Sequence, residues 1–123
     1  WQNPNLNTPP ILYKVNTTTG AYSRLGTATY SSFQAMTALS RTATELYIVD
    51  GNSLWSLNVN TGQSNLIKFQ GFKNTTAMTA YGDHLYIASD GYMYKVDGTG
   101  KILLKSGGFG SVTSMGAFTA LGL

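Results

Sequence analysis

Three segments of this chain repeat one another, and the repeat constrains the fold more than any other feature. A short apolar and aromatic run occurs three times, at residues 12–15, 54–57 and 93–96. Each copy is followed by a Thr-Gly pair, at Thr19-Gly20, Thr61-Gly62 and Thr99-Gly100. A methionine among small residues recurs in step, at Met36, Met78 and Met115. A period of about 40 residues indicates structural units that stack on one another.

Within each repeat, the residue pattern predicts short β-strands and no helix. Runs of β-branched and aromatic residues alternate with turn-forming Gly, Asn and Asp, and no helical period is present. Tight turns are expected at Asp50-Gly51-Asn52 and at Asp90-Gly91, because these residues tolerate a positive φ angle. The predicted strands span residues 10–15, 21–25, 33–39, 45–49, 53–58, 63–68, 76–81, 84–88, 92–96, 101–105 and 112–118.

The order of strands within one repeat predicts the blade of a propeller. The strand at residues 76–81 is rich in small residues, which suit the crowded innermost strand of a blade. We therefore expect an all-β fold, a β-propeller-type repeat of four-stranded antiparallel blades over residues 12–123. The expected parts are an N-terminal arm or linker at 1–11, an outer half-blade at 12–25, blades at 30–68 and 72–105, and the inner part of a blade at 109–123.

The number of blades predicts a partner. Propellers close with about four to eight blades, whereas this chain supplies about three, with incomplete blades at both ends. Two copies would form a six-bladed ring, in which the C-terminal inner strand of each chain completes the N-terminal outer pair of the other. The alternatives are the remainder of a longer chain and a closed monomeric sandwich. An isolated open monomer is disfavoured, because it would leave bare sheet edges.

Composition excludes several classes of function. The eight Lys and Arg residues form no run, so we expect no nucleic-acid partner. No apolar run reaches the roughly 18 residues of a membrane span. The chain has no cysteine and one histidine, His84, and its few carboxylates fall largely in predicted turns, which leaves no pair for acid–base chemistry. We expect a protein that is not an enzyme and that uses no cofactor and no metal.

The polar residues favour a secreted or extracellular location. Thr, Ser, Asn and Gly replace charged residues over much of the chain, as is common in secreted β-proteins, and the sequence starts at Trp1 without a methionine. Asn16 and Asn74 each begin an Asn-x-Thr triplet, which is an acceptor for N-glycosylation in secreted proteins.

Two segments carry a resemblance to known families. Residues 54–63 resemble the blade repeat of quinoprotein-like and related secreted propellers, in which an aromatic strand leads into an Asn/Asp-x-x-Thr-Gly turn. The run Ser106-Gly107-Gly108-Phe109, followed by Met115, is similar to the blades of tachylectin- or tectonin-type lectins, in which a Gly-Gly-aromatic loop precedes the inner strand. The resemblance covers residues 12–118. It implies a propeller fold and, for the lectin blades, the binding of sugars.

Three loop aromatics are the candidate ligand-binding residues. Tyr30, Phe72 and Phe109 each stand six residues before a landmark methionine, at equivalent positions of the repeat. We expect them on the same face as the hairpin tips that carry the polar residues Asp50, Asn52, Asp90 and Tyr92. Aromatic rings beside carboxylate and amide groups suit a sugar, whose C–H face stacks on the ring. The alternative is that the three rings fill the wedge between neighbouring blades.

The leading expectation is therefore a lectin that binds glycans through one shallow site per blade. Several weak sites on one assembly would gain strength through multivalency. The alternative function is a structural or protein-interaction propeller with no small ligand. A metal-dependent hydrolase is a third reading, for which the sequence offers no evident ligand set.

Overall fold

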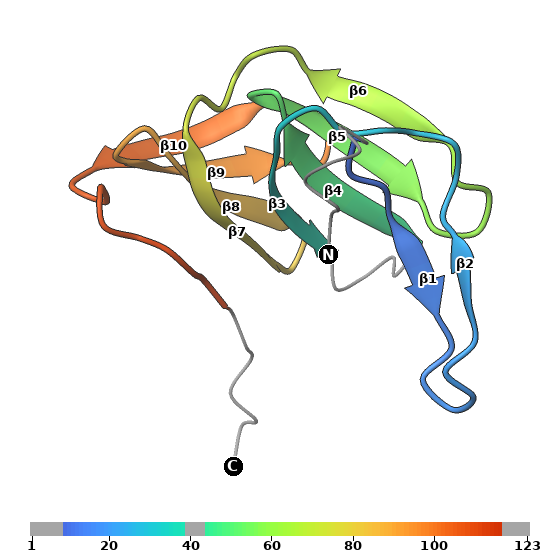
Figure 1. Cartoon of the computed structure of the whole chain (residues 1–123). Helices are drawn as coiled ribbons and strands as arrows, with labels where there is room; N and C mark the ends of the chain where they lie inside the picture. The colour runs from blue at the N-terminus through green and yellow to red at the C-terminus, as the bar shows by residue number, and fades with distance from the viewer. Residues whose placement is uncertain (1–8, 39–43, 117–123) are drawn as a thin grey trace.

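The computed structural model describes residues 9–38 and 44–116, and these residues form ten β-strands (Figure 1). Every strand pair is antiparallel. Strand β1 (Tyr13–Val15) pairs with β2 (Tyr22–Arg24) in a two-stranded hairpin. No helix occurs among the described residues. The prediction of an all-β fold is confirmed.

Two four-stranded sheets follow the hairpin, and in each the strands lie side by side in chain order. The first sheet contains β3 (Phe33–Ala38), β4 (Glu45–Asp50), β5 (Ser53–Asn58) and β6 (Ser64–Lys68). The second sheet contains β7 (Thr75–Tyr81), β8 (His84–Ser89), β9 (Tyr92–Asp97) and β10 (Ile102–Gly107). Ten of the eleven predicted strands therefore have a counterpart. The described sheets are open, and none closes into a ring.

The eleventh predicted strand, at residues 112–118, does not form over residues 112–116. Residues 117 and 118 lie outside the described part of the chain. A strand needs a neighbour that pairs with its N–H and C=O groups, and this segment joins none of the described sheets. The first predicted strand is also shorter than expected, because Pro10 has no N–H to donate to a ladder.

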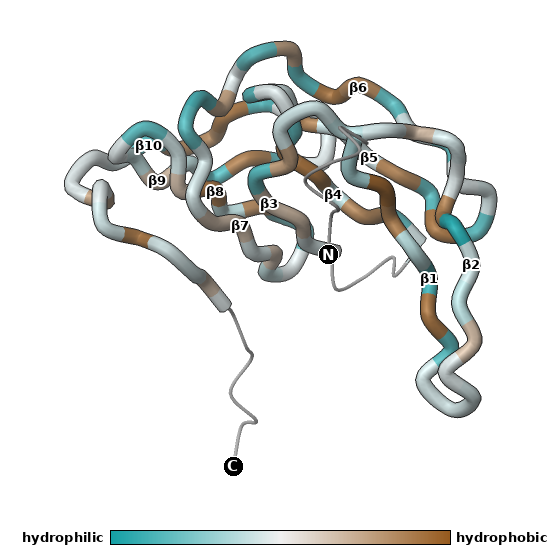
Figure 2. Tube along the Cα trace, viewed as in Figure 1, coloured by the Kyte–Doolittle hydropathy of each residue, from teal (hydrophilic) through white to brown (hydrophobic). Residues whose placement is uncertain are grey.

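The two four-stranded sheets pack face to face around the larger apolar core. Their first strands, β3 and β7, contact each other. The first sheet contributes Ala35, Tyr47, Val49, Leu54 and Ile67, and the second contributes Met78, Ala80, Leu85, Ile87, Tyr94 and Val96. Phe72, from the loop that joins the sheets, is fully buried among them. Figure 2 shows the apolar stretches along β4 and β5 that this packing requires.

A second, smaller core lies on the opposite face of the first sheet, toward the β1–β2 hairpin. Its members are Leu12, Leu25, Ala28, Tyr30, Leu46, Ile48, Trp55 and Leu57. Leu12 and Tyr30 stand where Leu54 and Phe72 stand one repeat later. The same packing is therefore used twice, and the first sheet is covered on both faces.

The repeated Thr-Gly pairs close one kind of turn three times. Asn16, Asn58 and Asp97 occupy the same repeat position, and a side-chain oxygen of each accepts hydrogen bonds from N–H groups two to four residues ahead, at 2.9–3.1 Å. The glycine of each pair has a φ angle of 74–85°, which a residue with a Cβ adopts only with strain. This explains why glycine recurs there.

Candidate functional site

The loop aromatics occupy equivalent places, as the repeat predicts. The backbone N–H of Tyr30 donates to the carbonyl of Pro10 at 3.1 Å, and that of Phe72 donates to Asn52 at 3.0 Å. The N–H of Phe109 donates to the carbonyl of Gly91 at 2.9 Å. Asn52 and Gly91 lie in the hairpin turns of the two four-stranded sheets, so Phe72 and Phe109 are each held at a sheet's end by their own backbone, whereas Tyr30 is held by the segment before β1.

Burial separates these three rings. Phe72 is 0% exposed and Tyr30 is 5% exposed, and the Phe72 ring meets Tyr94 edge-on with centroids 5.6 Å apart. A ring with no free face cannot stack on a sugar, so these two rings fill the wedge between neighbouring sheets. Phe109 is 36% exposed, because no described sheet covers it.

The polar residues expected to contact a sugar make hydrogen bonds that join hairpin turns to neighbouring loops. The Asp50 carboxylate accepts hydrogen bonds from the N–H groups of Ser31 and Ser32, at 3.2 and 2.8 Å. The N–H of Asn52 donates to the side chain of Gln34 at 3.0 Å. These bonds fix the loop that leads from β2 into β3.

The second sheet uses its turn residues in a similar way. Asp90 accepts a hydrogen bond from the side-chain amide of Asn74 at 3.3 Å. Tyr92 is partly exposed, but the ammonium group of Lys105 lies 4.0 Å from its ring centroid. A cation over the ring occupies the face that a sugar would use. Asp90, Tyr92 and Phe109 therefore form no enclosed site.

Tyr30 and Asp50 do meet in a pocket, together with residues that the sequence interpretation missed. The pocket lies beside the first sheet and is lined by Ala28, Thr29, Tyr30, Asp50, Trp55 and Ser64. The Tyr30 hydroxyl is buried, and it makes no hydrogen bond to any described group. Buried hydroxyl groups are nearly always hydrogen-bonded in proteins, so a buried hydroxyl without a described partner is an unusual feature of a residue that lines the pocket.

The charge state of Tyr30 suits a hydrogen-bond donor. Burial raises the pKa of the Tyr30 hydroxyl, and the negative charge of Asp50 raises the pKa further. The hydroxyl therefore keeps its proton at neutral pH. The Asp50 carboxylate still has lone pairs beyond those used by Ser31 and Ser32. The residues that line the pocket thus include a hydrogen-bond donor, an acceptor and the indole of Trp55.

The corresponding position in the second repeat has none of these polar groups. Phe72 replaces Tyr30 and packs on Tyr94, which stands in place of Trp55. Ser89 replaces Asp50, and its hydroxyl donates to the Lys73 carbonyl at 2.6 Å. The features of the pocket therefore occur at one of the two described interfaces between repeats. One sequence feature could have singled out Trp55: it is a tryptophan at a position where the other two copies of the repeat carry tyrosine, Tyr13 and Tyr94.

Within residues 9–38 and 44–116, no three His, Cys, Asp or Glu side chains gather into a group that could hold a metal ion. No helix in that part of the chain has the length and apolarity to span a membrane. In comparisons with known proteins, no family model matches this chain and no curated protein matches it either.

Proposed function

We propose that this chain is a non-enzymatic carbohydrate-binding protein of the β-propeller type, secreted, with one sugar site in the pocket between Tyr30, Asp50 and Trp55. The observation that carries the proposal is the buried Tyr30 hydroxyl, which has no hydrogen-bond partner among the described residues. In this proposal the two four-stranded sheets are propeller blades. Two copies of the chain together would complete the ring.

The chemistry of the pocket supports a small polyhydroxylated ligand. A sugar hydroxyl can accept a hydrogen bond from the Tyr30 hydroxyl, and another can donate a hydrogen bond to the Asp50 carboxylate. Leaving a buried hydroxyl without a partner costs about 1–3 kcal/mol, so a ligand that supplies an acceptor gains that much. The half-buried indole of Trp55 and the hydroxyl of Ser64 line the same space. An aromatic face with a few convergent polar groups is the usual composition of such a site.

The structure supports one site per chain and not one per blade. The second interface is filled by Phe72 and Tyr94, and it has no equivalent of Asp50. In this proposal, multivalency arises from assembly, because each additional copy brings one more pocket. A structural propeller with no small ligand is the alternative, and in it the Tyr30 ring serves packing while its hydroxyl has no binding role.

The proposal is tested by ligand binding to a variant that loses one oxygen. We would screen the wild-type chain on a glycan array, then titrate the sugars it retains against wild type and Tyr30→Phe. Trp1 and Trp55 are the two tryptophans, so the titration uses a Trp1→Phe background in which Trp55 reports alone. The expected result is a change in Trp55 emission for wild type, with an affinity for Tyr30→Phe at least about tenfold weaker, as expected for one lost hydrogen bond.

The matched control is Tyr92→Phe, which removes a phenolic hydroxyl outside the pocket. It should bind with wild-type affinity. No sugar retained on the array, or equal affinities for wild type and Tyr30→Phe, would contradict the proposal.

A further inference from the structure

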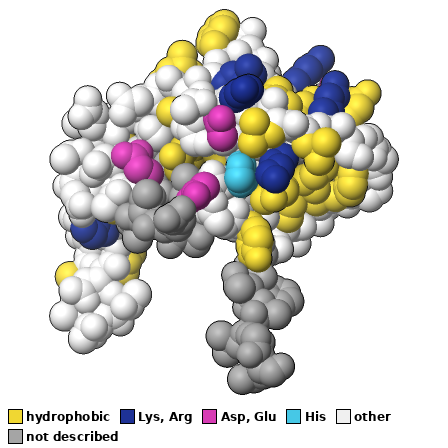
Figure 3. All heavy atoms as spheres, turned by 180° about the vertical axis from the view of Figure 1, so that it is seen from behind, with side chains coloured by type: hydrophobic (Ala, Val, Ile, Leu, Met, Phe, Trp, Pro, Cys, Tyr) yellow, Lys and Arg dark blue, Asp and Glu magenta, His cyan; other side chains and the backbone are white. Residues whose placement is uncertain are grey.

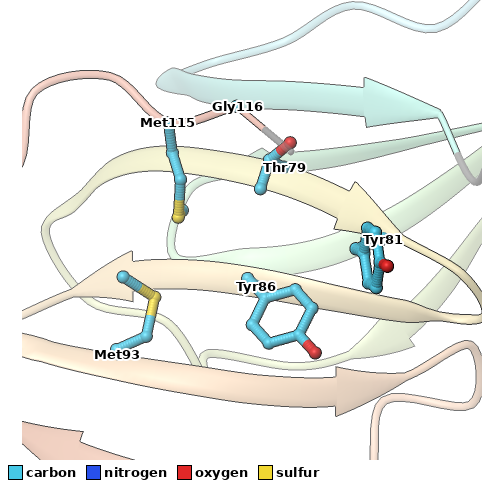
Figure 4. A pocket seen from close by; sticks show the side chains of 6 residues that line it. All are labelled: Thr79, Tyr81, Tyr86, Met93, Met115 and Gly116. Atoms are coloured by element: carbon cyan, nitrogen blue, oxygen red, sulfur yellow. The ribbon is translucent and has the colours of Figure 1, made fainter. Parts of the chain in front are cut away.

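One face of the second sheet is covered by no other sheet of the described residues. Residues that pair directly across neighbouring strands lie on the same face of a sheet. In the second sheet, one such row of paired residues consists of Thr79, Tyr86, Lys95 and Leu104. Tyr81, Tyr86 and Met93 line an apolar hollow on this face, beside Met115 of the C-terminal segment (Figure 4). Figure 3 shows the hydrophobic side chains gathered here, next to the single histidine. We call this surface the open face.

The open face has the composition of an inter-sheet contact. Four residues of the first sheet that pack under the second sheet are Ala35, Tyr47, Val49 and Leu54. One repeat later the same positions are Ala77, Tyr86, Ala88 and Met93. The small residues Ala77 and Ala88 are buried, but the two large ones are not: Tyr47 and Leu54 are buried, whereas Tyr86 and Met93 are partly exposed. The open face therefore repeats one half of a contact that the chain already makes, without the other half.

The missing half is present at the other end of the chain. Val15 of β1 corresponds to Leu57 and Val96 in the later repeats. Both of these are 0% exposed beneath a neighbouring sheet or loop, whereas Val15 is 56% exposed. Tyr13, which corresponds to Trp55 and Tyr94, is also largely exposed, and its ring meets Tyr22 edge-on at 5.6 Å. The β1–β2 hairpin thus presents apolar side chains at positions that are covered in the complete repeats.

The turn glycines give an independent indication. A Cβ on Gly100 would lie 2.8 Å from the side chain of Ile67, and one on Gly62 would lie 2.7 Å from the Gly26 nitrogen. Each of these turns therefore rests on the preceding repeat. A Cβ on Gly20, in the same turn of the first repeat, would meet no described atom within 4 Å. Gly20 is therefore the same turn glycine as Gly62 and Gly100, but no described residue packs against it.

We propose that the open face of β7–β10 binds the β1–β2 hairpin of a second copy of this chain. The contact repeats the packing between the two four-stranded sheets, with Met93 beneath the hairpin and Gly20 against the end of β10. Because the two halves lie at opposite ends of the chain, one pair of copies makes the contact twice and leaves neither half exposed. This contact rests on the two-copy ring of the proposed function, but it lies apart from the Tyr30 pocket, so the dimer and the sugar site can each fail without the other.

The test is the mass in solution, measured by light scattering after size exclusion over a series of concentrations. The wild-type chain should have about twice its mass of 13.2 kDa. Met93→Glu should shift the population to the monomer, because it places a charge where the contact is apolar. Gly20→Asn should do the same, since Asn tolerates a positive φ angle but its side chain would occupy the space of the second copy.

The matched control for Gly20→Asn is Gly82→Asn. Gly82 is also a turn glycine with a positive φ angle, 59°, and with open space for a Cβ, but it lies in the β7–β8 turn, which the proposal does not place against the hairpin. This variant should keep the wild-type mass, and circular dichroism should show a folded chain for all variants. A wild-type chain that stays a folded monomer would overturn the proposal and would favour a further repeat of a longer protein as the occupant. A dimer that survives both Met93→Glu and Gly20→Asn would overturn it as well.

Discussion

Tyr30 and Phe72 occupy the same position in successive repeats, and their backbone N–H groups donate to equivalent carbonyls, but Tyr30 carries in addition a buried oxygen without a partner among the described residues. The repeat itself thus provides a reference for the site. At Phe72 the ring is used for packing alone. At Tyr30 the same packing carries one additional polar atom, next to Asp50 and Trp55.

Tyr30→Phe should leave the free energy of unfolding unchanged or raise it slightly. The variant removes a buried hydroxyl that has no described partner, and Phe fits the equivalent position of the next repeat. The reverse change, Phe72→Tyr, should lower the free energy of unfolding by about 1–3 kcal/mol, because it buries a hydroxyl without a partner. Urea denaturation measures both. A loss of more than about 1 kcal/mol for Tyr30→Phe would show that the hydroxyl already has a structural role.

Phe72→Ala should strongly destabilise the fold. The ring is fully buried between the two sheets, and such truncations cost about 3–5 kcal/mol. The control is Phe69→Ala, since Phe69 is largely exposed in the turn after β6 and its loss should cost less than about 0.5 kcal/mol. Thermal or urea unfolding separates the two. Equal effects would mean that Phe72 is not part of the core.

Gly62→Ala should destabilise the protein more than Gly82→Ala does. Both glycines have positive φ angles, of 75° and 59°, so both variants incur about 1–2 kcal/mol of backbone strain. At Gly62 the new Cβ would also press on the backbone of Gly26, whereas at Gly82 it would meet nothing within 4 Å. The difference between their unfolding free energies measures the contact between repeats. Equal losses would show that this contact contributes nothing.

The Asp97 carboxyl should titrate below its ordinary range. A hydrogen bond from the Thr99 hydroxyl, at 2.6 Å, is the main cause of its lowered pKa, and the N–H groups of Lys101 and Thr99 add to it. Because the folded pKa is lowered, the stabilisation is present above the ordinary value of 3.8 and is lost as the pH falls through the folded pKa. An NMR titration of the side-chain carbon measures this. A pKa at or above the ordinary value would mean that the turn does not bind the carboxylate.

Much of the fold follows from the sequence because the repeat and the strand pattern act locally. The Thr-Gly pairs need a positive φ angle, and alternating strands need one apolar face, so both leave a residue-by-residue signal. The segment at 112–116 departs from its repeat because strand formation depends on a neighbour. The sequence of the segment itself does not specify which strand would pair with it.

The site was harder to predict, because burial decides what an aromatic ring can do. Tyr30, Phe72 and Phe109 have the same spacing in the sequence, but they differ in the surface that covers them. Asn52 was expected at a binding face, whereas its hydrogen bond holds a loop, and Asp50 holds the same loop while it also lines the Tyr30 pocket. Trp55 looks like one more strand aromatic in the sequence, and its place in the pocket depends on the loop at Thr29 and Tyr30 folding over it.

The central claim is that the Tyr30 pocket binds a sugar, and a crystal structure of the chain with a sugar selected on the glycan array tests it most directly. The account predicts a sugar hydroxyl within about 3 Å of the Tyr30 oxygen, as a hydrogen bond requires. It also predicts a second sugar oxygen at Asp50 and the sugar ring against Trp55. A sugar bound elsewhere, or a pocket that holds water alone at saturating sugar, would contradict it.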